Sequence, residues 1–430
     1  MVEKKALNVE ERTPYKEREE FPKVYVIGMG IVSPLGLNLP TTWENLKAGK
    51  SGISNIDIEG TDIKIAGSIN NFNPKEMLPS GIKIRRVSRP AQFGLAAVIE
   101  AFQDAGLPTE KEELEAKVDT RRFGVCGGTG IGGANDMPRV SDRLKEGKKP
   151  SPIDVLLIEP ERIATVVSMQ LGLRGPLTCV TAACATGNRA ITDAYKDMLA
   201  NDADLMVVVA AESTLDPVTL ESFNSAGALS REQNIFASKP LDHKRNGFVM
   251  SEGGASLILA TEEIVKKLGL RPKAELVAYG NTADAGDDTE PTGEGAERAM
   301  RIALKRAGRF RPETFYINAH ATSTPKGDSK EVLAIRSVFG EDAKKILISS
   351  TKGAGGHGMG AAGLMEAVFC IKAIEEGVVP PTANLEDPMD EAEGLNLVPR
   401  EAQVKEVETA MNNSFGFGGI NSVTIFKGAV

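Results

Sequence analysis

The chain has 430 residues, of which 41% are apolar and 26% are charged, a balance typical of globular proteins. Its formal net charge of −8 argues against a nucleic-acid partner, because phosphate binding needs a basic surface. No apolar run approaches the roughly 18 residues of a membrane-spanning helix, so we expect no membrane partner.

The N-terminal segment and the cysteines indicate the compartment in which we expect the protein to act. Residues 1–22 are rich in Glu and contain no apolar signal-peptide core, so we expect a solvated tail. The four cysteines are too few for a disulfide framework in a chain of this length. No CxxC pair occurs, so we expect no metal site. The expected location is the reducing cytoplasm.

In chain order, β-branched runs alternate with helical patterns. A first buried strand is predicted at residues 23–30, and a charged helix end near residues 265–285 marks a weak division of the chain. Alternating strands and helices predict an α/β fold with parallel or mixed sheets. Further strands are predicted at 123–128, 176–180, 205–211, 274–280, 315–318, 345–350 and 422–428, and helices at 91–106, 188–200 and 363–377.

Cys184 stands out because of its position. A strand ends just before it, the small residues Thr181–Ala183 turn the chain, and a predicted helix follows. The unsatisfied N–H groups at a helix start favour a thiolate, so we expect a lowered pKa and a nucleophile. Taken alone, a buried structural thiol remains the alternative. Cys126, Cys179 and Cys370 are expected to be structural, within apolar elements.

Two of the three histidines strengthen the catalytic interpretation. His320 and His357 each follow an apolar strand, in loops made of small or hydroxyl residues. Strand ends that carry a turn cysteine and two histidines are typical of a nucleophilic site. His243, in the segment LDHKRNG, is expected to be a surface turn residue.

Two glycine-rich segments match a dinucleotide-binding pattern but are weak evidence for it. Residues 128–133 and 353–358 both match GxGxxG after a strand, and Glu375 follows the second by about twenty residues, as in a dinucleotide fingerprint. Both segments lie far from the first βαβ unit, and a lone match is weak. A dinucleotide-dependent oxidoreductase therefore stays as an alternative, and so does a cysteine hydrolase.

The chain as a whole resembles the β-ketoacyl-acyl carrier protein synthases, in particular the elongating type II condensing enzymes. The resemblance covers residues 23–428 and rests on blocks that occur in a fixed order. These are VIGMGIVSPLG, TAACATG, FVMSEGG, NAHATSTPKGD, STKGAGGHGMGAAG, PPTANLEDP and NNSFGFGGIN.

The resemblance implies a thiolase-like fold. Two pseudo-symmetric βαβαβαββ-type halves would form a five-layered α/β/α/β/α core, with an N-terminal half at 23–270 and a C-terminal half at 271–430. It also implies a homodimer in the cytoplasm.

The resemblance assigns a role to each of a small set of residues. Cys184 would be the nucleophile, with His320, His357, Lys352 and Glu366 completing the catalytic set. Glu366 would hold Lys352, or else a structural cation together with Asn318. Phe417 would gate the acyl pocket and share the oxyanion hole with the N–H of Cys184. The residues that contact the substrate would be Thr322, Thr324, Phe415 and Ile131.

The implied activity is a decarboxylative Claisen condensation in fatty acid elongation. An acyl group on Cys184 would react with malonyl-acyl carrier protein, giving β-ketoacyl-acyl carrier protein, without a cofactor. Acyl carrier protein would thus be the main partner. A basic patch of Lys83, Arg85, Arg86 and Arg89 could dock this acidic carrier, although a solvated helix face is the alternative.

Three departures from the family pattern affect the expectation. Ile420 and Ala321 stand where the family usually has Thr and Gly, and both narrow the approach to the site. Residues 281–290 form an acidic loop where elongating enzymes usually carry an aromatic–histidine pair. We therefore expect altered coupling to the phenylalanine gate and altered chain-length preference. A specialised polyketide or secondary-lipid ketosynthase of the same fold remains an alternative.

Overall fold

The structure is a computed structural model that describes residues 22–287 and 290–429. Apart from Pro22, the predicted tail lies outside the described residues, and so does Asp288 of the acidic loop. Within the described ranges, no helix is long and apolar enough to cross a membrane.

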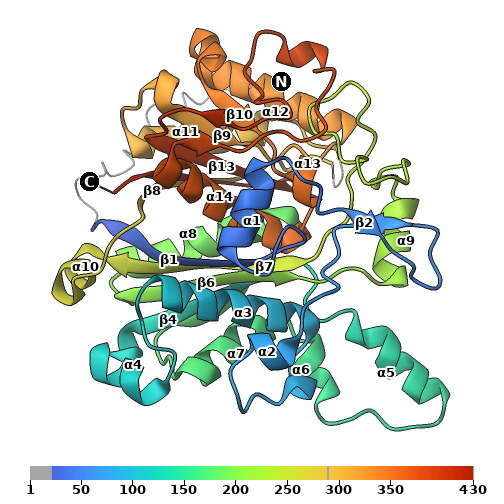
Figure 1. Ribbon diagram of the computed structural model, residues 1–430, viewed down its shortest axis with the longest axis vertical. Helices are drawn as coiled ribbons and strands as arrows, with labels where there is room; N and C mark the ends of the chain where they lie inside the picture. The colour runs from blue at the N-terminus through green and yellow to red at the C-terminus, as the bar shows by residue number, and fades with distance from the viewer. Residues whose placement is uncertain (1–21, 288–289, 430) are drawn as a thin grey trace, which may run out of the picture.

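Ten strands form one continuous sheet with two similar halves (Figure 1). The first half has the order β5-β4-β6-β7-β1 and the second has the order β10-β9-β13-β14-β8. Numbered within each half, both orders read 3-2-4-5-1. The halves meet where β1 pairs with β8, at Tyr25 opposite Glu275 and Val26 opposite Ala274. The strands are β1 (Val24–Val32), β4 (Phe123–Gly128), β5 (Leu177–Val180), β6 (Leu205–Glu212), β7 (Gly253–Thr261), β8 (Ala274–Ala283), β9 (Phe315–Asn318), β10 (Leu347–Ser349), β13 (Thr409–Gly416) and β14 (Ile420–Gly428).

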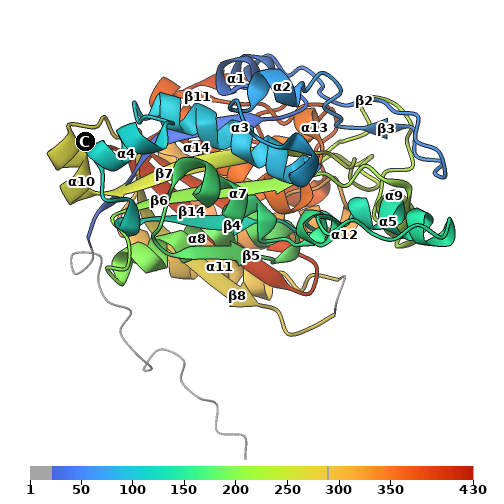
Figure 2. The same ribbon diagram turned by 90° about the horizontal axis from the view of Figure 1, so that it is seen from below.

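Helices cover both faces of both half-sheets, as Figures 1 and 2 show. Helices α8 (Thr186–Leu199) and α14 (Ala362–Glu376) lie between the two half-sheets, and both contribute to the same apolar core. Helices α3 (Arg89–Asp104) and α7 (Arg162–Leu171) pack on the outer face of the first half. Helices α11 (Glu294–Ala307) and α12 (Pro325–Phe339) pack on the outer face of the second. This confirms the predicted five-layered α/β/α/β/α core.

The burial of the layers explains their sequences. Every residue of β6 is buried, so its run LMVVVAAE is apolar almost throughout rather than alternating. Helix α14 is buried at each position from Ala362 to Ile371, because it contacts sheet on two sides. Amphipathic α11, which covers an outer face, is instead buried only along one stripe.

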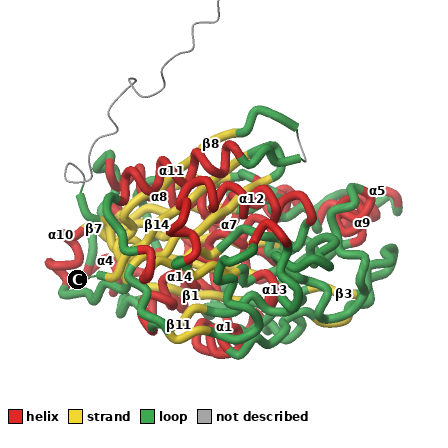
Figure 3. Tube along the Cα trace, turned by 90° about the horizontal axis from the view of Figure 1, so that it is seen from above, coloured by secondary structure: helices red, strands yellow, loops and turns green. Residues whose placement is uncertain are grey.

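Shorter elements lie around this core (Figure 3). Two small two-stranded sheets pair β2 (Ser54–Asn55) with β3 (Ile65–Ala66) and β11 (Val378–Val379) with β12 (Gln403–Val404). The remaining helices are α1 (Leu39–Lys47), α2 (Pro74–Met77), α4 (Lys111–Lys117), α5 (Asp136–Lys145), α6 (Asp154–Ile158), α9 (Pro217–Ser225), α10 (Glu262–Leu268) and α13 (Lys352–Gly355).

The topology brings the predicted catalytic residues to one edge of the sheet. Strands β4, β5 and β6 are mutually parallel, as are β9, β10 and β13, so their carboxyl ends share an edge within each half. Cys184 follows β5, His320 follows β9 and His357 follows β10. Open α/β sheets place ligand sites beyond such strand ends.

Candidate active site

Cys184 lies on a tight turn between β5 and α8. The 3-10 helix η5 (Ala183–Ala185) carries it, and Ala183 adopts a left-handed φ of +47° that costs energy for a residue other than glycine. The hydroxyl of Thr186 closes the turn, since it accepts from the Ala182 N–H at 2.8 Å and donates to the Ala183 carbonyl at 2.7 Å. Strained turns of this kind are held at functional sites.

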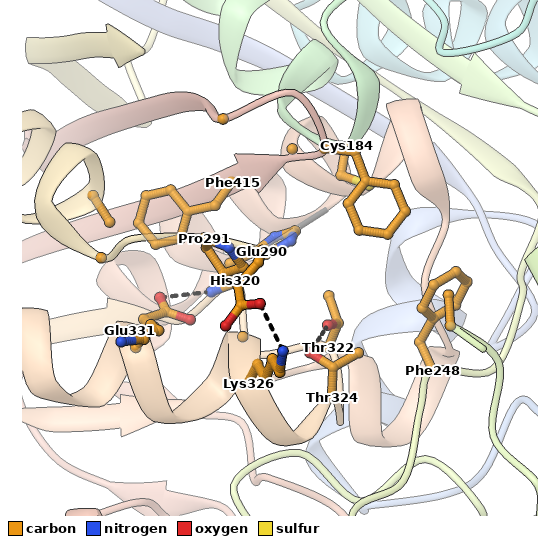
Figure 4. A pocket seen from close by; sticks show the side chains of 18 of the residues that line it. Cys184, Phe248, Glu290, Pro291, His320, Thr322, Thr324, Lys326, Glu331 and Phe415 are labelled. Carbon is orange, nitrogen blue, oxygen red and sulfur yellow. Dashed lines mark hydrogen bonds and ion pairs between the residues drawn. The ribbon is translucent and has the colours of Figure 1, made fainter. Parts of the chain in front are cut away.

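Cys184 opens into a cavity of about 430 Å³ that also contains both predicted histidines. Figure 4 shows Cys184 at one end and Thr322, Thr324 and Lys326 toward another, with His320 between them. The structure therefore brings together most of the predicted site residues. Those that line the cavity are Cys184, His320, Thr322, Thr324, His357, Phe415 and Phe417.

The two histidines face each other across the cavity. Their ring centroids are 5.5 Å apart at an interplanar angle of 82°. Phe415 packs edge-on to His320 at 5.8 Å, and Phe248 packs edge-on to His357 at 5.1 Å. Burial, together with the nearby charge of Lys352, holds the pKa of both imidazoles well below the ordinary value of 6.5. Both rings are therefore neutral near pH 7, and each can donate one N–H.

The prediction of a low pKa for the nucleophile is wrong. Cys184 is only 6% exposed, and burial raises its pKa to about 12. Lys352 and the N–H groups of Phe417 and Cys184 lower the pKa, and the negative charge of Glu212 raises it. Loss of solvation outweighs the favourable groups, so the resting sulfur is a thiol.

Lys352 and Glu366 form a buried ion pair behind the histidines. The Lys352 ammonium donates to Glu366 Oε1, and both side chains are almost fully buried. Neither residue lines the cavity of Cys184. Burial raises the pKa of Glu366 to about 7, against the opposing effect of Lys352. The expected contact of Glu366 with Lys352 is thus present.

The second carboxylate oxygen of Glu366 is also of interest. Among the described residues, Glu366 Oε2 and the side-chain oxygens of the buried Asn318, Asn412 and Asn413 lack a hydrogen-bond partner. Oxygen atoms of this kind are ligands for a hard cation, so these residues fit the expected alternative of a structural cation held by Glu366 and Asn318.

Glu331 was not identified from the sequence. It lies on α12, lines the cavity and is buried. Its carboxylate accepts from the N–H of His320 at 2.9 Å and of Ala321 at 2.7 Å, and from Asn413 Nδ2 at 2.9 Å. It therefore fixes the backbone that carries His320. A carboxylate on the buried face of an amphipathic helix was the available signal. Phe248, which contacts His357, was likewise not assigned a role.

The outer part of the cavity is polar. The hydroxyls of Thr322 and Thr324 are 3.1 Å apart, and Thr322 is buried whereas Thr324 is half-buried. Lys326 and Glu290 form an exposed ion pair at 2.7 Å, visible in Figure 4. Exposure rises from the buried Thr322 through the half-buried Thr324 to the exposed Lys326, so this side of the cavity leads to the solvent.

The turn between β13 and β14 carries Phe417 and contacts the acidic loop. Phe417 is 40% exposed and stacks on Phe223 at 6.3 Å. Asp284 Oδ1 accepts from Asn421 Nδ2 at 2.7 Å, and the Asp284 N–H donates to the Gly419 carbonyl at 2.9 Å. The loop is therefore coupled to this turn through Asp284. Ile420 begins β14 beside it.

Ile131 lies elsewhere than expected. It is half-buried and does not line the cavity that contains Cys184. Its N–H instead donates to Glu212 Oε1 at 3.3 Å.

The remaining cysteines and His243 were expected to be structural or surface residues. Cys126 and Cys370 are fully buried, as expected for structural thiols. Cys179 lies within strand β5, as predicted, and is half-buried there because β5 is the last strand of its half-sheet. His243 is a surface residue, with Nε2 at 3.1 Å from Asp390.

All four residues of the predicted basic patch are exposed, and one of them is paired within the fold. Lys83, Arg85 and Arg86 are exposed on and beside a short 3-10 helix. Arg89 instead forms a bidentate ion pair with the buried Glu252, with contacts of 2.7 and 2.9 Å. Its charge is therefore used within the fold.

One glycine of the first glycine-rich segment lies at a close approach of two chain segments. A Cβ on Gly360, two residues beyond the second glycine-rich segment, would lie 2.3 Å from the Gly130 nitrogen. Close packing therefore accounts for Gly130 without a dinucleotide.

Family models match most of the chain. The model described as "Beta-ketoacyl synthase, N-terminal domain" matches residues 22–264. The model described as "Beta-ketoacyl synthase, C-terminal domain" matches residues 273–386.

Similar proteins agree with these models. The chain is 38% identical to 3-oxoacyl-[acyl-carrier-protein] synthase 2 of Staphylococcus aureus (strain COL) over 413 residues, which cover 94% of this chain and 98% of that protein. The enzyme of the same name from Vibrio cholerae is 38% identical over 416 residues, which cover 94% of this chain and 99% of that protein.

Solved structures extend the comparison. A type II polyketide ketosynthase, in complex with its acyl-carrier protein and bound to the hexaketide, superposes with a TM-score of 0.85 at 32% identity, covering 95% of this chain and all of that chain. A β-ketoacyl synthase from Burkholderia phymatum STM815 has a TM-score of 0.87 at 29% identity and the same coverage.

Proposed function

Because the chain belongs to the β-ketoacyl synthase family, we propose that it extends acyl chains in fatty acid synthesis. An acyl group on Cys184 would be condensed with malonyl-acyl carrier protein, giving β-ketoacyl-acyl carrier protein and carbon dioxide. The observation that carries this proposal is the cavity shared by Cys184, His320 and His357. One nucleophile and two neutral donors are what the two half-reactions require.

The first half-reaction transfers the acyl group to Cys184. The sulfur attacks the carbonyl carbon of the carrier thioester, and the tetrahedral oxyanion accepts hydrogen bonds from the N–H groups of Cys184 and Phe417. The carbon–sulfur bond to the carrier then breaks. The Cys184 thiol gives its proton to a neutral imidazole, which passes the proton on to the carrier thiolate. An oxyanion-hole donor is worth roughly 3–4 kcal/mol.

The second half-reaction forms the carbon–carbon bond. The malonyl carboxylate leaves as carbon dioxide, and its bonding electrons move to the thioester oxygen as an enolate. His320 and His357 donate hydrogen bonds to that oxygen, since neutral imidazoles carry one N–H each. The enolate carbon attacks the acyl carbonyl on Cys184, the bond to sulfur breaks, and the Cys184 thiolate takes up one proton from the solvent. No electron leaves the system, so the reaction needs no redox cofactor.

Lys352 and Glu366 support this chemistry from behind. The Lys352 charge adds to burial in keeping both imidazoles neutral, and Glu366 orients the ammonium. Glu366 Oε2 and Asn318 would hold the alternative structural cation, which would supply fixed positive charge behind the site.

The outer cavity fits a long, flexible thioester arm. Thr322 and Thr324 would donate hydrogen bonds to the pantetheine amides of the carrier. Lys83, Arg85 and Arg86 would attract the acidic carrier from the surface, and affinity would then fall with added salt. Ala321 and Ile420 would narrow the approach and influence which acyl chains enter, and the acidic loop would do so through Asp284.

We also propose a cytoplasmic homodimer built on the edge of the first half-sheet. Strand β5 is the last strand of that half, and its Leu177 is 39% exposed. An uncovered edge strand is a template for pairing with a second chain. The division of the monomer at residue 270 stays a prediction.

A specialised ketosynthase of the same fold is the second candidate. The structural likeness to the polyketide ketosynthase and the acidic loop at the cavity mouth support it. Both candidates share the condensation chemistry and differ in the acyl group accepted.

The test mixes purified protein with acyl-carrier and malonyl-carrier, and measures carbon dioxide and the mass of the carrier product. We expect a product longer by two carbons. His320→Ala and His357→Ala should abolish carbon dioxide release, whereas His243→Ala, at the third histidine, should not. Free fatty acid without condensation would instead indicate a hydrolase, and consumption of NAD(P)H an oxidoreductase.

A further inference from the structure

Glu212 is a buried carboxylate directly behind the nucleophile. It ends β6 and has no exposed surface. Oε1 accepts from Thr129 Oγ1 at 3.0 Å and from the Ile131 N–H at 3.3 Å. Oε2 accepts from the N–H of Gly130 at 2.6 Å and of Gly360 at 3.1 Å. Four donors thus converge on one carboxylate.

No cation compensates this charge. Across residues 22–287 and 290–429, none of the ion pairs involves Glu212. Burial raises its pKa to about 7 despite the four hydrogen bonds. A buried carboxylate held only by dipoles is costly, and an apolar side chain would fill the space more cheaply. The position therefore calls for an explanation other than stability.

The carboxylate joins two segments that adjoin the chain around Cys184, since the Thr129 carbonyl accepts from Thr181 Oγ1 at 3.1 Å and Met359 shares an apolar cluster with Cys184. One is the loop at residues 129–132 that follows β4, where Thr129 Oγ1 also accepts from the Gly132 N–H at 2.9 Å. The other is the 3-10 helix η8 (Met359–Ala361), which begins two residues after His357. Both segments approach the carboxylate closely, because a Cβ on Gly130 or Gly360 would lie 2.8 or 2.6 Å from Oε2.

The second segment reaches the sulfur through Met359. This residue adopts a left-handed φ of +48°, which costs energy unless the surroundings hold it. The next N–H, of Gly360, is the one bonded to Glu212. The Met359 side chain belongs to the same buried apolar cluster as Cys184 and Phe248, and Phe248 contacts His357. A shift of η8 would therefore move the wall around the nucleophile.

We infer that Glu212 is a positioning residue for acyl transfer: it holds the loop 129–132 and the turn after His357 in fixed places around Cys184. This inference rests on the proposed function. It assigns to Glu212 no contact with substrate.

The test compares Glu212→Gln with Glu100→Gln. In Glu212→Gln, an amide NH₂ replaces one carboxylate oxygen. The NH₂ group cannot accept the hydrogen bonds that this oxygen accepts in the wild-type protein. Glu100 is a matched control, since its carboxylate accepts from the N–H of Ile31 at 2.8 Å and of Leu39 at 2.6 Å, and its pKa is also raised to about 7. Glu100 does not line the cavity.

The readout is the mass of the Cys184 peptide over time after mixing with acyl-carrier. We expect Glu212→Gln to lower the rate constant of acylation at least tenfold, with the same final fraction of Cys184 loaded. Glu100→Gln should acylate at the wild-type rate. Glu212→Asp keeps the charge but is shorter, so its rate should lie between those of wild type and Glu212→Gln.

Two outcomes would overturn the inference. One is a wild-type rate constant in Glu212→Gln; the other is a lower final fraction loaded with an unchanged rate, which would indicate a purely structural role. If Glu212→Gln does not fold, Thr129→Val is tested in its place, because this variant removes one hydrogen-bond donor to Glu212 Oε1. An unchanged acylation rate in Thr129→Val would reject the inference. Failure of the proposed function is recognised separately, as absence of acylation in the wild-type protein.

Discussion

The residues around Cys184 combine deep burial with neutral hydrogen-bond donors. Burial keeps the sulfur protonated and both imidazoles uncharged, so these three groups carry no charge of their own before substrate enters. In such a site, the hydrogen-bond donors act on the negative charge that develops on a substrate oxygen. The grouping of Cys184, His320 and His357 in one cavity was accessible from the sequence because strand ends, small neighbours and motif order place them.

The protonation state of Cys184 was not accessible in that way. A helix start favours a thiolate, and the sequence shows that helix. The competing effect is loss of solvation, which depends on what covers the sulfur in three dimensions, such as Phe248 and Met359 from distant parts of the chain. Glu212 was missed for the same reason, because its hydrogen-bond donors are 81 to 148 residues away in sequence.

The raised pKa of Cys184 predicts how its alkylation depends on pH. With a pKa of about 12, the rate of reaction with iodoacetamide should rise about tenfold per pH unit from pH 7 to 9, since only thiolate reacts. Mass spectrometry of the Cys184 peptide measures this rate. A plateau below pH 8 would show a stabilised thiolate and contradict the account; Cys184→Ala serves as the blank.

The buried pair of Lys352 and Glu366 predicts a stability change that depends on pH. Lys352→Met leaves Glu366 buried without its cation and should cost about 3 kcal/mol of unfolding free energy at pH 7. Glu366 would then stay neutral in the folded protein but ionise above its ordinary pKa when unfolded. The loss relative to wild type should therefore grow as the pH rises through about 7, where Glu366 ionises in the folded wild-type protein but not in the variant.

Urea unfolding at several pH values measures this effect. The double variant Lys352→Met/Glu366→Gln should recover part of the stability and lose the pH dependence. A loss that is equal at pH 5 and pH 8 would show that Glu366 does not respond to Lys352.

At the scale of elements, the two central helices are packed as closely as their backbones allow. A Cβ on Gly187 of α8 would lie 2.3 Å from the Leu364 nitrogen of α14. Asn188 beside it donates to the Asn412 carbonyl of β13 at 2.9 Å, and Asn412 Nδ2 donates back to Asn188 Oδ1 at 2.9 Å. The start of the nucleophile helix is thus fixed against both α14 and β13.

This packing explains which elements the sequence revealed. The apolar strands β4 and β9 were predicted with their observed bounds. Strand β13 was recognised as a motif but not as a strand, because its Asn412, Asn413 and Ser414 are polar. Those side chains find buried partners on α8 and α12, which only the tertiary structure supplies. Strand β7 begins with two glycines and was missed as well.

The contact of Gly187 gives a direct test at this scale. Gly187→Ala should push α8 away from α14, destabilise the protein by about 1–3 kcal/mol and slow acylation of Cys184. Gly428→Ala is the control, since its Cβ would meet Ile374 at an ordinary 3.6 Å. Thermal unfolding and the acylation rate are measured for both. Equal behaviour of the two variants would mean that the close crossing does not hold the nucleophile.

At the scale of the whole molecule, two halves with the same strand order enclose α8 and α14 and meet at β1 and β8. The sequence revealed no internal similarity, because the order of strands depends on packing and connection rather than on particular residues. The shared edge of parallel strand ends then follows from topology, and it explains why residues as distant as Cys184 and His357 share one cavity.

The exposed edge strand β5 predicts the oligomeric state. Light scattering should give about twice the monomer mass of 45.8 kDa. Leu177→Lys, a charge on the exposed edge, should shift the mass toward the monomer, whereas Val404→Lys, at an exposed residue of the separate small sheet β11–β12, should not. A monomeric wild-type protein would contradict this prediction.

The central claim is that Cys184 carries the acyl chain, and the most direct measurement is the mass of its peptide after incubation with acyl-carrier thioesters of increasing length. The account predicts one acyl group on Cys184, absent in Cys184→Ala, with loading that depends on chain length. It also predicts that malonyl-carrier removes this group as β-ketoacyl-carrier. If no chain length loads Cys184 in the folded protein, the assignment as an elongating synthase is contradicted.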